Sequence, residues 1–337
     1  ALASQGIRAL NARYHRGSGP APFLLLTRQR EWNASEGRWM AWERKRGKLH
    51  QLNRLIIDGT TKDLHLVEGD REALTGVRFV LTLDADTFLP EGTAARLVAT
   101  LAHPLHAPRF EDGRVTEGYT VLQPRVESIP DSERPTWFSR VHQVRDGLDL
   151  YSHASSDVYQ DLFGEGIYAG KGLYDVRAFE RSLEGRVPEN ALLSHDLFEG
   201  EHGRVALVSD VSVIEDYPSQ PEAYMRRLHR WVRGDWQILP WLLPTVRSAS
   251  GERIPNTLSL LSRWKIFDNL RRSLLATSLV LLAALGWLVL PGGAWWTLVP
   301  LLVLGVPTLL PELTVAVAAL ASPREEGRFR SSSGRVK

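Results

Sequence analysis

The sequence predicts an α/β domain followed by an interfacial helix and membrane-spanning segments, and three observations support this. Short apolar runs alternate with stretches of helical periodicity through residues 1–254, as in α/β proteins. One of these runs, residues 78–83, ends abruptly at two carboxylates, Asp84 and Asp86. Residues 273–321 contain a single charged side chain, which is typical of a segment within a bilayer.

The overall composition excludes several classes of protein. A chain with 43% apolar and 24% charged residues is globular. Its formal charge of +2 argues against nucleic acid as a partner. It has no cysteine, so disulfides and thiolate chemistry are excluded, which is compatible with a site that faces the reducing cytosol. The ten histidines are scattered and do not predict a zinc site.

The elements of the first 254 residues can be placed in order. Each expected strand is a short apolar run bounded by turn residues, and each expected helix repeats apolar residues at a spacing of three and four. We expect strands at 23–27, 78–83, 119–126 and 204–214, and helices at 48–57, 90–102 and 136–151.

The acidic turn after residues 78–83 is a candidate metal site. In open α/β sheets, ligands bind beyond the carboxyl ends of strands, which is where Asp84 and Asp86 are expected. Two carboxylates two residues apart suit Mg²⁺ or Mn²⁺, hard ions that prefer oxygen ligands. The alternative is an acidic cap for the helix that begins near Pro90.

The segment 224–237 carries four arginines within eight positions of a helical pattern: Arg226, Arg227, Arg230 and Arg233. Like charges at these spacings oppose helix formation by roughly 0.2–0.5 kcal/mol per pair, and a bound polyanion would relieve this. Arg227 and Trp231 share a face, so the surface offers guanidinium groups for phosphate oxygens and an indole for a sugar ring. The alternative is a solvated basic face with Trp231 in the core.

Residues 255–272 and 273–321 predict contact with a membrane. The first range alternates apolar with basic residues and is expected to be an amphipathic interfacial helix; a linker helix packed on the domain is the alternative. The second range contains two apolar runs separated by Pro291-Gly-Gly, expected as two transmembrane segments, with a buried hairpin as the alternative. Basic residues precede the first run and follow the second, so the segments before and after the pair are both expected to be cytoplasmic. Residues 322–337 predict a flexible basic tail.

Several sequence blocks occur together in one order. They are Leu-Leu-Thr-Arg with Trp-Asn-x-x-Glu-Gly-x-Trp-Met (25–40), Asp-Ala-Asp (84–86), Gly-Lys-Gly-Leu-Tyr-Asp-Val (170–176), Leu-Ser-His-Asp-Leu-Phe-Glu-Gly (193–200), Arg-Leu-His-Arg-Trp (227–231) and Arg-Trp-Lys-Ile-Phe-Asp-Asn-Leu-Arg-Arg (263–272). From about residue 20 to residue 290, the chain resembles the glycosyltransferase domain of cyclic β-1,2-glucan synthases. These are processive inverting membrane glycosyltransferases related to cellulose synthase.

The resemblance implies a GT-A-like (Rossmann-like) core at residues 1–254 and a role for each block. Asp86 and Asp84 are expected to bind the metal ion and the nucleotide sugar, and Asp196 is expected to be the general base, with His195 as the alternative. The remaining expected nucleotide ligands are Lys48 and the pyrophosphate-binding motif Arg227, Arg230 and Trp231. Related synthases usually carry Gln at the position of Arg227.

The implied function is that of an inverting β-glucosyltransferase that uses UDP-glucose with Mg²⁺ or Mn²⁺. It would elongate a β-1,2-glucan, which the full-length enzyme later cyclises, at the cytoplasmic face of a bacterial inner membrane. The implied partners are UDP-glucose, the growing glucan and the lipid bilayer. A first strand and further helices are expected before Ala1, and a phosphorylase-like domain after Lys337. The alternatives are a synthase for another sugar or linkage, and a catalytically silent scaffold that binds nucleotide or glycan.

A protein-bound primer is the last expectation from the resemblance. A hydroxyl side chain near the site would be the first acceptor, and a phenol, with a pKa of about 10, is easier to deprotonate than an aliphatic hydroxyl. Tyr14, at the end of an opening helix and before a Gly-Ser-Gly-Pro turn, is the first candidate. Tyr151, Tyr159 and Tyr168 are its rivals. The alternative is that Tyr14 only packs against the end of its helix.

Overall fold

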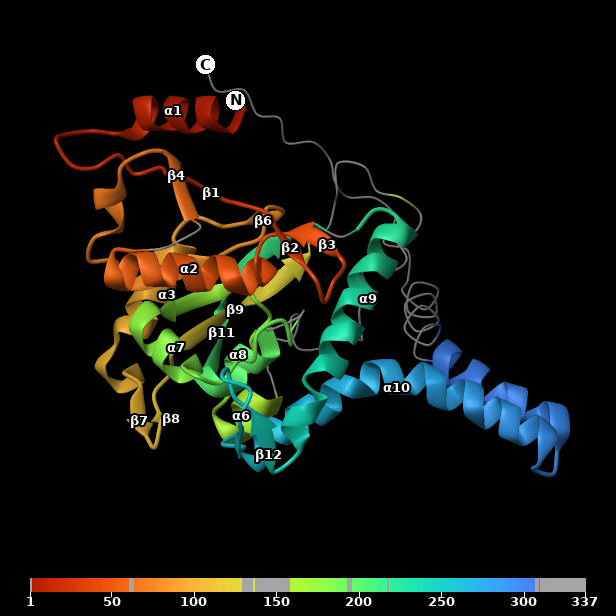
Figure 1. Ribbon diagram of the computed structural model, residues 1–337. Helices are drawn as coiled ribbons and strands as arrows, with labels where there is room; N and C mark the ends of the chain where they lie inside the picture. Colours follow the sequence, from red (N-terminus) through yellow and green to blue (C-terminus); the bar gives the residue numbers. More distant parts are fainter. Residues whose placement is uncertain are drawn as a thin grey trace, which may run out of the picture. The chain divides into compact units, whose positions relative to one another are not determined.

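The computed structural model contains a five-stranded mixed sheet (Figure 1). The structure describes residues 2–60, 64–128, 136, 158–192, 196–216, 218–306 and 309. The chain divides into two compact units, residues 1–271 and residues 272–337. The first unit contains the sheet and confirms the predicted mixed α/β class.

The sheet has the strand order β5 (Phe79–Thr82), β10 (Gly172–Asp175), β9 (Val121–Ser128), β11 (Val205–Glu215) and β6 (Thr87–Phe88). β9 and β11 are parallel, whereas β10 is antiparallel to both β5 and β9, and β6 is antiparallel to β11. Consequently β5, β9 and β11 end at one edge of the sheet, and β10 begins at that same edge.

Helices cover both faces of the sheet because neighbouring strand residues point in opposite directions. Leu122 of β9 packs in a cluster with Leu97 and Leu101 of α3 (Thr93–Ala102). Its neighbour Val121 belongs to the opposite cluster, with α7 (Val176–Leu183) and the end of α2 (Arg44–Asp58). Figure 1 shows α2 and α7 in front of the strands. An apolar layer therefore lies on each side of the sheet.

Smaller elements surround this core. Three hairpins are β2 (Glu31–Asn33) with β3 (Arg38–Met40), β7 (Arg109–Glu111) with β8 (Arg114–Glu117), and β12 (Thr245–Arg247) with β13 (Arg253–Pro255). β1 (Leu25–Arg28) pairs with β4 (Leu64–Glu68). Further helices and single turns among the described residues of the first unit are α1 (Leu2–Tyr14), η1 (Arg71–Leu74), η2 (Pro104–His106), α6 (Val158–Phe163), α8 (Asp196–Gly203), α9 (Pro221–Gln237) and η3 (Leu239–Leu242).

Most element boundaries agree with the sequence within three residues, and α2 is the main correction. It begins at Arg44 instead of residue 48. The residue before it, Glu43, has a left-handed backbone with φ of 49°, and a helix entry of this kind gives no pattern that sequence periodicity detects. The helix expected at 136–151 lies outside the described residues, except for Thr136.

α10 (Leu260–Leu288) begins in the first unit, and its first turns pack on the domain. Ile266 and Leu270 are buried, whereas Trp264 and Phe267 are about half exposed. Lys265 is also buried and pairs with Glu201 of α8 at 3.2 Å. Lys265 therefore does not face solvent, and a carboxylate inside the domain compensates its charge.

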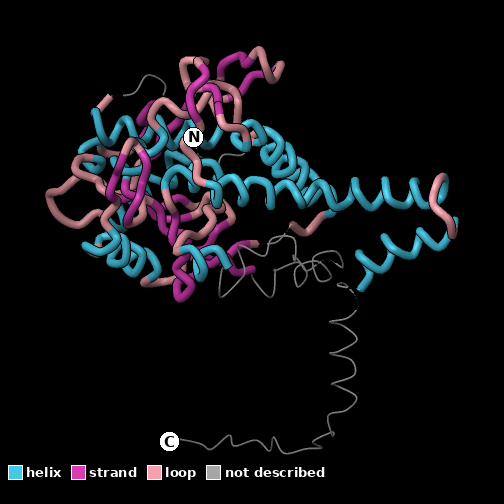
Figure 2. Tube along the Cα trace, turned by 90° about the horizontal axis from the view of Figure 1, so that it is seen from below, coloured by secondary structure: helices cyan, strands magenta, loops and turns pink. Residues whose placement is uncertain are grey.

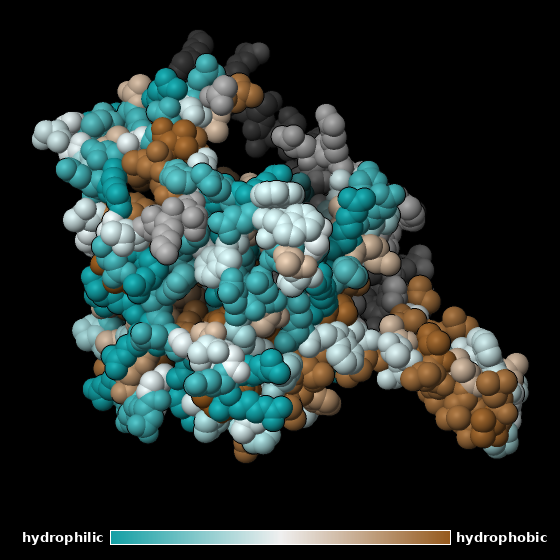
Figure 3. Space-filling view, viewed as in Figure 1, coloured by the Kyte–Doolittle hydropathy of each residue, from teal (hydrophilic) through white to brown (hydrophobic). Residues whose placement is uncertain are grey.

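In the second unit, taken by itself, the described residues up to 306 form a helical hairpin in which a Pro-Gly-Gly turn joins two helical segments (Figure 2). A β-carbon at Gly286 would lie 2.2 Å from Cβ of Trp296, so the helices approach closely where the side chain is absent. Apolar side chains cover the visible face of this unit (Figure 3). Among the described residues, no single helix is both long and apolar enough to span a membrane. Residues 260–271 and 273–288, bent by 53°, pass that test together, and Gly293–Val306 is a shorter apolar helix.

Candidate functional site

Three carboxylates meet where strands of the central sheet end. Asp84 and Asp86 follow β5, and Glu215 is the last residue of β11. The short strand β6 joins these ends, because its Thr87 pairs with Glu215. One ligand oxygen from each carboxylate lies within 4.8 Å of the other two, so the three residues could together hold a metal ion.

Two lysines supply positive charge to this acidic cluster of Asp84, Asp86 and Glu215. Lys45, in the first turn of α2, lies 2.8 Å from Oδ1 of Asp84. Lys171, just before β10, pairs with Glu215 and lies 3.5 Å from Oδ2 of Asp84. Burial alone would raise the pKa of Asp84, but the two ammonium groups outweigh it and the pKa is lowered. Asp84 is therefore ionised at neutral pH.

α9 also reaches the acidic cluster. Nη2 of Arg227 lies 3.8 Å from Oε2 of Glu215. The same guanidinium lies 4.5 Å from the ring centroid of Trp231, so the shared face expected from the sequence is a cation–π contact. Arg230 is exposed on the same helix. Arg227 is thus the arginine of the motif that the fold brings directly to the acidic cluster.

The hairpin of β2 and β3 connects α9 with the start of α2 through one carboxylate. Glu36, in the hairpin turn, lies 2.6 Å from Arg233 of α9 and 3.6 Å from Arg44 of α2. It also contacts Arg38 at 2.9 Å. The side chain of Asn33 accepts the backbone N–H of Glu36 at 3.0 Å and thereby shapes the turn. Within the part of the chain that the structure describes, Arg227 and Arg233 therefore have carboxylate partners.

Asp196 is the first residue of α8 and lies beside the loop that leads into β10. A β-carbon at Gly170 would lie 2.6 Å from both Cγ and Oδ1 of Asp196. The backbone oxygen of Gly170 accepts hydrogen bonds from Lys45 at 2.9 Å and from Thr82 at 3.3 Å. Gly170 thus separates Asp196 from the lysine that holds Asp84. His195 lies outside the described residues.

Lys48 is exposed on α2, one turn beyond Lys45. Because α2 begins four residues earlier than expected, its first turn carries Lys45 to Asp84. The structure thus identifies Lys45 as a cation of the site, and the expected nucleotide contact of Lys48 stays a prediction.

The tyrosines proposed as primers differ in exposure. Tyr14 is 49% exposed at the end of α1. Tyr168 and Tyr159 are buried, with hydroxyl contacts to Thr82 at 3.1 Å and Asp268 at 3.3 Å. Burial raises the pKa of Tyr168 well above its ordinary value. Tyr151 lies outside the described residues.

Sequence reasoning missed Glu215, Lys171 and Lys45 as members of the site. The sequence contains a weak signal for Glu215. Like Asp84, it is a carboxylate that directly follows an expected strand. Nothing in the sequence says that Glu215 comes near Asp84. Two strands lie between β5 and β11 in the sheet, and the pairing of Thr87 in β6 with Glu215 brings the two carboxylates together. Lys171 occurs within the Gly-Lys-Gly motif but was not assigned a role.

The fold and the acidic cluster together define an α/β protein with a candidate cation site at the carboxyl edge of its sheet. No family model matches the chain. Over 288 residues, 85% of the chain, it is 44% identical to cyclic β-(1,2)-glucan synthase NdvB of Rhizobium meliloti (strain 1021). The chain therefore belongs to the cyclic β-(1,2)-glucan synthase family, as the motifs indicated. The matched region spans 10% of the length of that relative.

Proposed function

We propose that this chain is the glycosyltransferase part of a glucan synthase, with a GT-A-like core that transfers glucose from UDP-glucose with inversion. Its product would be a β-1,2-glucan that the complete polypeptide later cyclises. The observation that carries the proposal is the meeting of Asp84, Asp86 and Glu215 with Arg227 at the carboxyl edge of the sheet. The identity to a cyclic β-(1,2)-glucan synthase supports the sugar and the linkage.

The acidic cluster and its cations suit the leaving diphosphate. As the anomeric C–O bond breaks, its electron pair moves to the diphosphate, so positive groups must lie there. Arg227 would bind these oxygens directly, while Arg230 and Trp231 would close the site. Asp84, Asp86 and Glu215 would hold Mg²⁺ or Mn²⁺, which would neutralise the same developing charge as a Lewis acid.

Asp196 would act on the acceptor as the general base. It would take the proton of a glucan hydroxyl while that oxygen attacks the anomeric carbon from the face opposite to the diphosphate. A single displacement of this kind converts an α-linked donor into a β-linked product. Gly170 supports this role because it lets the Asp196 carboxylate lie next to the backbone that also binds Lys45.

We further propose that the protein works at the cytoplasmic face of a bacterial inner membrane. The half-exposed Trp264 and Phe267 and the apolar helices of residues 273–306 support contact with lipid. Upstream helices and a downstream phosphorylase-like domain of the same polypeptide would be its other partners.

Two isosteric substitutions in the complete polypeptide test the proposal. Asp86→Asn and Asp196→Asn each remove a charge that the transition state needs, so each should abolish transfer from UDP-glucose. Asp112→Asn is the control, because Asp112 is exposed in a turn with φ of 49°, which Asn tolerates. Activity within tenfold of the wild type in either test variant would reject the assignment.

Binding should separate the two roles. Asp86→Asn and Glu215→Gln should weaken Mn²⁺ binding, measured by electron paramagnetic resonance, and metal-dependent UDP binding. Asp196→Asn should leave both nearly unchanged. Analysis of the linkage in the product would distinguish a β-1,2-glucan from another polysaccharide.

A further inference from the structure

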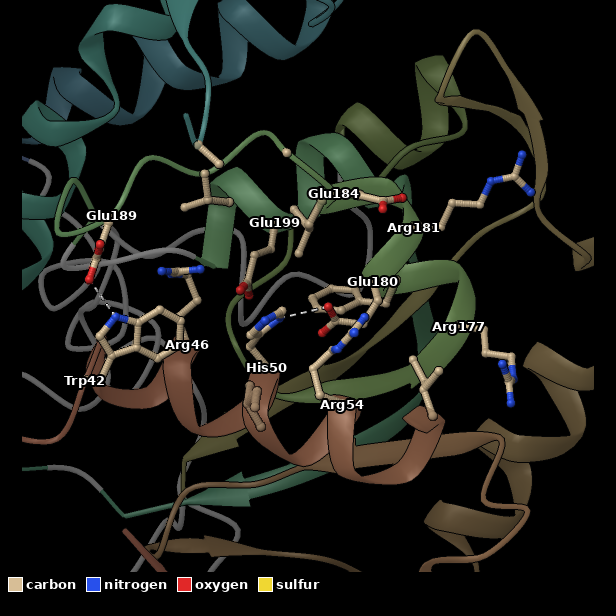
Figure 4. A pocket seen from close by; sticks show the side chains of 17 residues that line it. Trp42, Arg46, His50, Arg54, Arg177, Glu180, Arg181, Glu184, Glu189 and Glu199 are labelled. Atoms are coloured by element: carbon tan, nitrogen blue, oxygen red, sulfur yellow. Dashed lines mark hydrogen bonds and ion pairs between the residues drawn. The ribbon is translucent and has the colours of Figure 1, made fainter. Parts of the chain in front are cut away.

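A cavity of about 490 Å³ lies between α2 and α7, apart from the acidic cluster (Figure 4). Its volume is within the range of small-molecule sites. The buried side chains of Phe179 and Glu199 form part of its lining. Figure 4 shows His50 of α2 and Glu180 of α7 pointing toward each other, and they are 2.9 Å apart. Neither the three carboxylates of the cluster nor Asp196 lines this cavity.

The charges of the cavity balance. Four arginines and four glutamates line it. A strongly anionic ligand would therefore meet the glutamates, and a strongly cationic ligand would meet the arginines. Guanidinium groups only donate hydrogen bonds and carboxylates only accept them, whereas a hydroxyl group does both. A neutral ligand with many hydroxyl groups satisfies this lining best.

Trp42 gives the cavity an aromatic wall of fixed orientation. Its indole N–H donates to Oε1 of Glu189 at 3.1 Å. The guanidinium of Arg46 lies 5.4 Å from the ring centroid of Trp42, and the His50 ring lies at 6.1 Å. Aromatic side chains are common in the lining of small-molecule sites, where placed polar groups fix the orientation of the ligand. Together with the hydroxyl-binding groups, this wall suits the apolar face of a sugar ring.

The cavity shares two helices with the candidate active site. On α2, Lys45 binds Asp84 and the next residue, Arg46, lines the cavity. On α8, Asp196 is the first residue and Glu199, one turn later, lines the cavity. A molecule bound in the cavity would therefore contact α2 and α8, the two helices that carry Lys45 and Asp196.

We propose that this cavity is a second carbohydrate site, which binds a short neutral segment of glucan. The identification of the sugar as glucan rests on the proposed function, whereas the neutral polyhydroxylated class rests on the cavity itself. The bound segment would retain the polymer close to the enzyme while its growing end occupies the active site.

Obstruction of the cavity tests the proposal. Ala249 is exposed and lines the cavity. Its backbone N–H donates a hydrogen bond to the backbone oxygen of Gly185 at 2.9 Å, and this bond does not involve the side chain. Ala249→Trp should therefore fill the space without loss of that bond. The matched control is Thr245→Trp, at an exposed strand position nearby that does not line the cavity.

The probe is a short β-1,2-linked gluco-oligosaccharide, titrated by calorimetry into the protein in a detergent without sugar. The wild type and Thr245→Trp should bind it equally, and Ala249→Trp at least tenfold more weakly. Absent binding in the wild type, unchanged binding in Ala249→Trp, or displacement by inorganic phosphate would each overturn the proposal. UDP binding with Mg²⁺ should be the same in all three proteins. If the wild type binds the oligosaccharide in this pattern but not UDP, the proposed function fails and the carbohydrate site stands.

Discussion

The carboxylate of Asp196 packs so closely against the α-carbon of Gly170 that any side chain at residue 170 would collide with it. A β-carbon there would lie 2.6 Å from Cγ of Asp196, and φ of Gly170 is +81°, a conformation that L-residues rarely adopt. Glycine at this position therefore determines where the proposed base lies relative to Lys45 and Asp84.

Gly170→Ala should displace the Asp196 carboxylate and lower glucosyl transfer on the order of a hundredfold, since a shift of about 1 Å in a reacting group has that effect. Gly164→Ala is the matched control, because Gly164 has φ of +66° but its nearest contact would be 3.9 Å away. Both variants should lose similar stability in thermal unfolding. Equal activity in the two variants would show that the contact with Asp196 has no importance for transfer.

Glu36→Gln should loosen α9 while the acidic cluster stays intact. Loss of the carboxylate charge weakens the contact of Glu36 with Arg233 at 2.6 Å, and amides in α9 should exchange with deuterium severalfold faster as the helix opens locally. The affinity for UDP should fall as α9 loosens, because this helix also carries Arg227. Glu31→Gln, exposed on the same hairpin, is the control. Unchanged exchange in Glu36→Gln would exclude a positioning role for Glu36.

Glu201 should make stability depend on pH. Burial raises its pKa to about 7, although its partner Lys265 opposes the shift. The folded state therefore retains a proton that the unfolded chain releases near its ordinary pKa of about 4.3. Wild-type stability should fall relative to Glu201→Gln as the pH rises from about 4.3 to about 7, and then stay constant. Urea unfolding of both proteins at pH 4.5, 6 and 7.5 would measure this, and a difference independent of pH would contradict it.

Tyr14 should carry the first glucose. Peptide mass spectrometry of the protein after incubation with UDP-glucose should find hexose on Tyr14, which is exposed, and not on the buried Tyr159 or Tyr168. Tyr14→Phe should block initiation but leave transfer to an added oligosaccharide. Hexose found only on serine, threonine or another tyrosine would eliminate Tyr14 as the primer.

The sequence by itself determined features that depend on near neighbours. The apolar run that forms β5 and stops before Asp84 follows from local hydrophobicity and turn residues. The contact between Arg227 and Trp231 follows from helical spacing, because residues four apart lie on one face. The family also follows from the sequence, because its motifs are contiguous blocks and the 44% identity confirms them.

Only the tertiary structure decided which distant groups meet. Glu215 joins Asp84 because β6, which follows the Asp84 turn, pairs through Thr87 with Glu215 at the end of β11. Such a pairing depends on long-range hydrogen bonds that periodicity does not encode. Lys45 reaches Asp84 because α2 begins at Arg44, after a left-handed entry. Lys265 is buried because Glu201, 64 residues earlier in the sequence, compensates its charge inside the domain. In each case the partner is remote in the sequence, so the local pattern alone could not specify the contact.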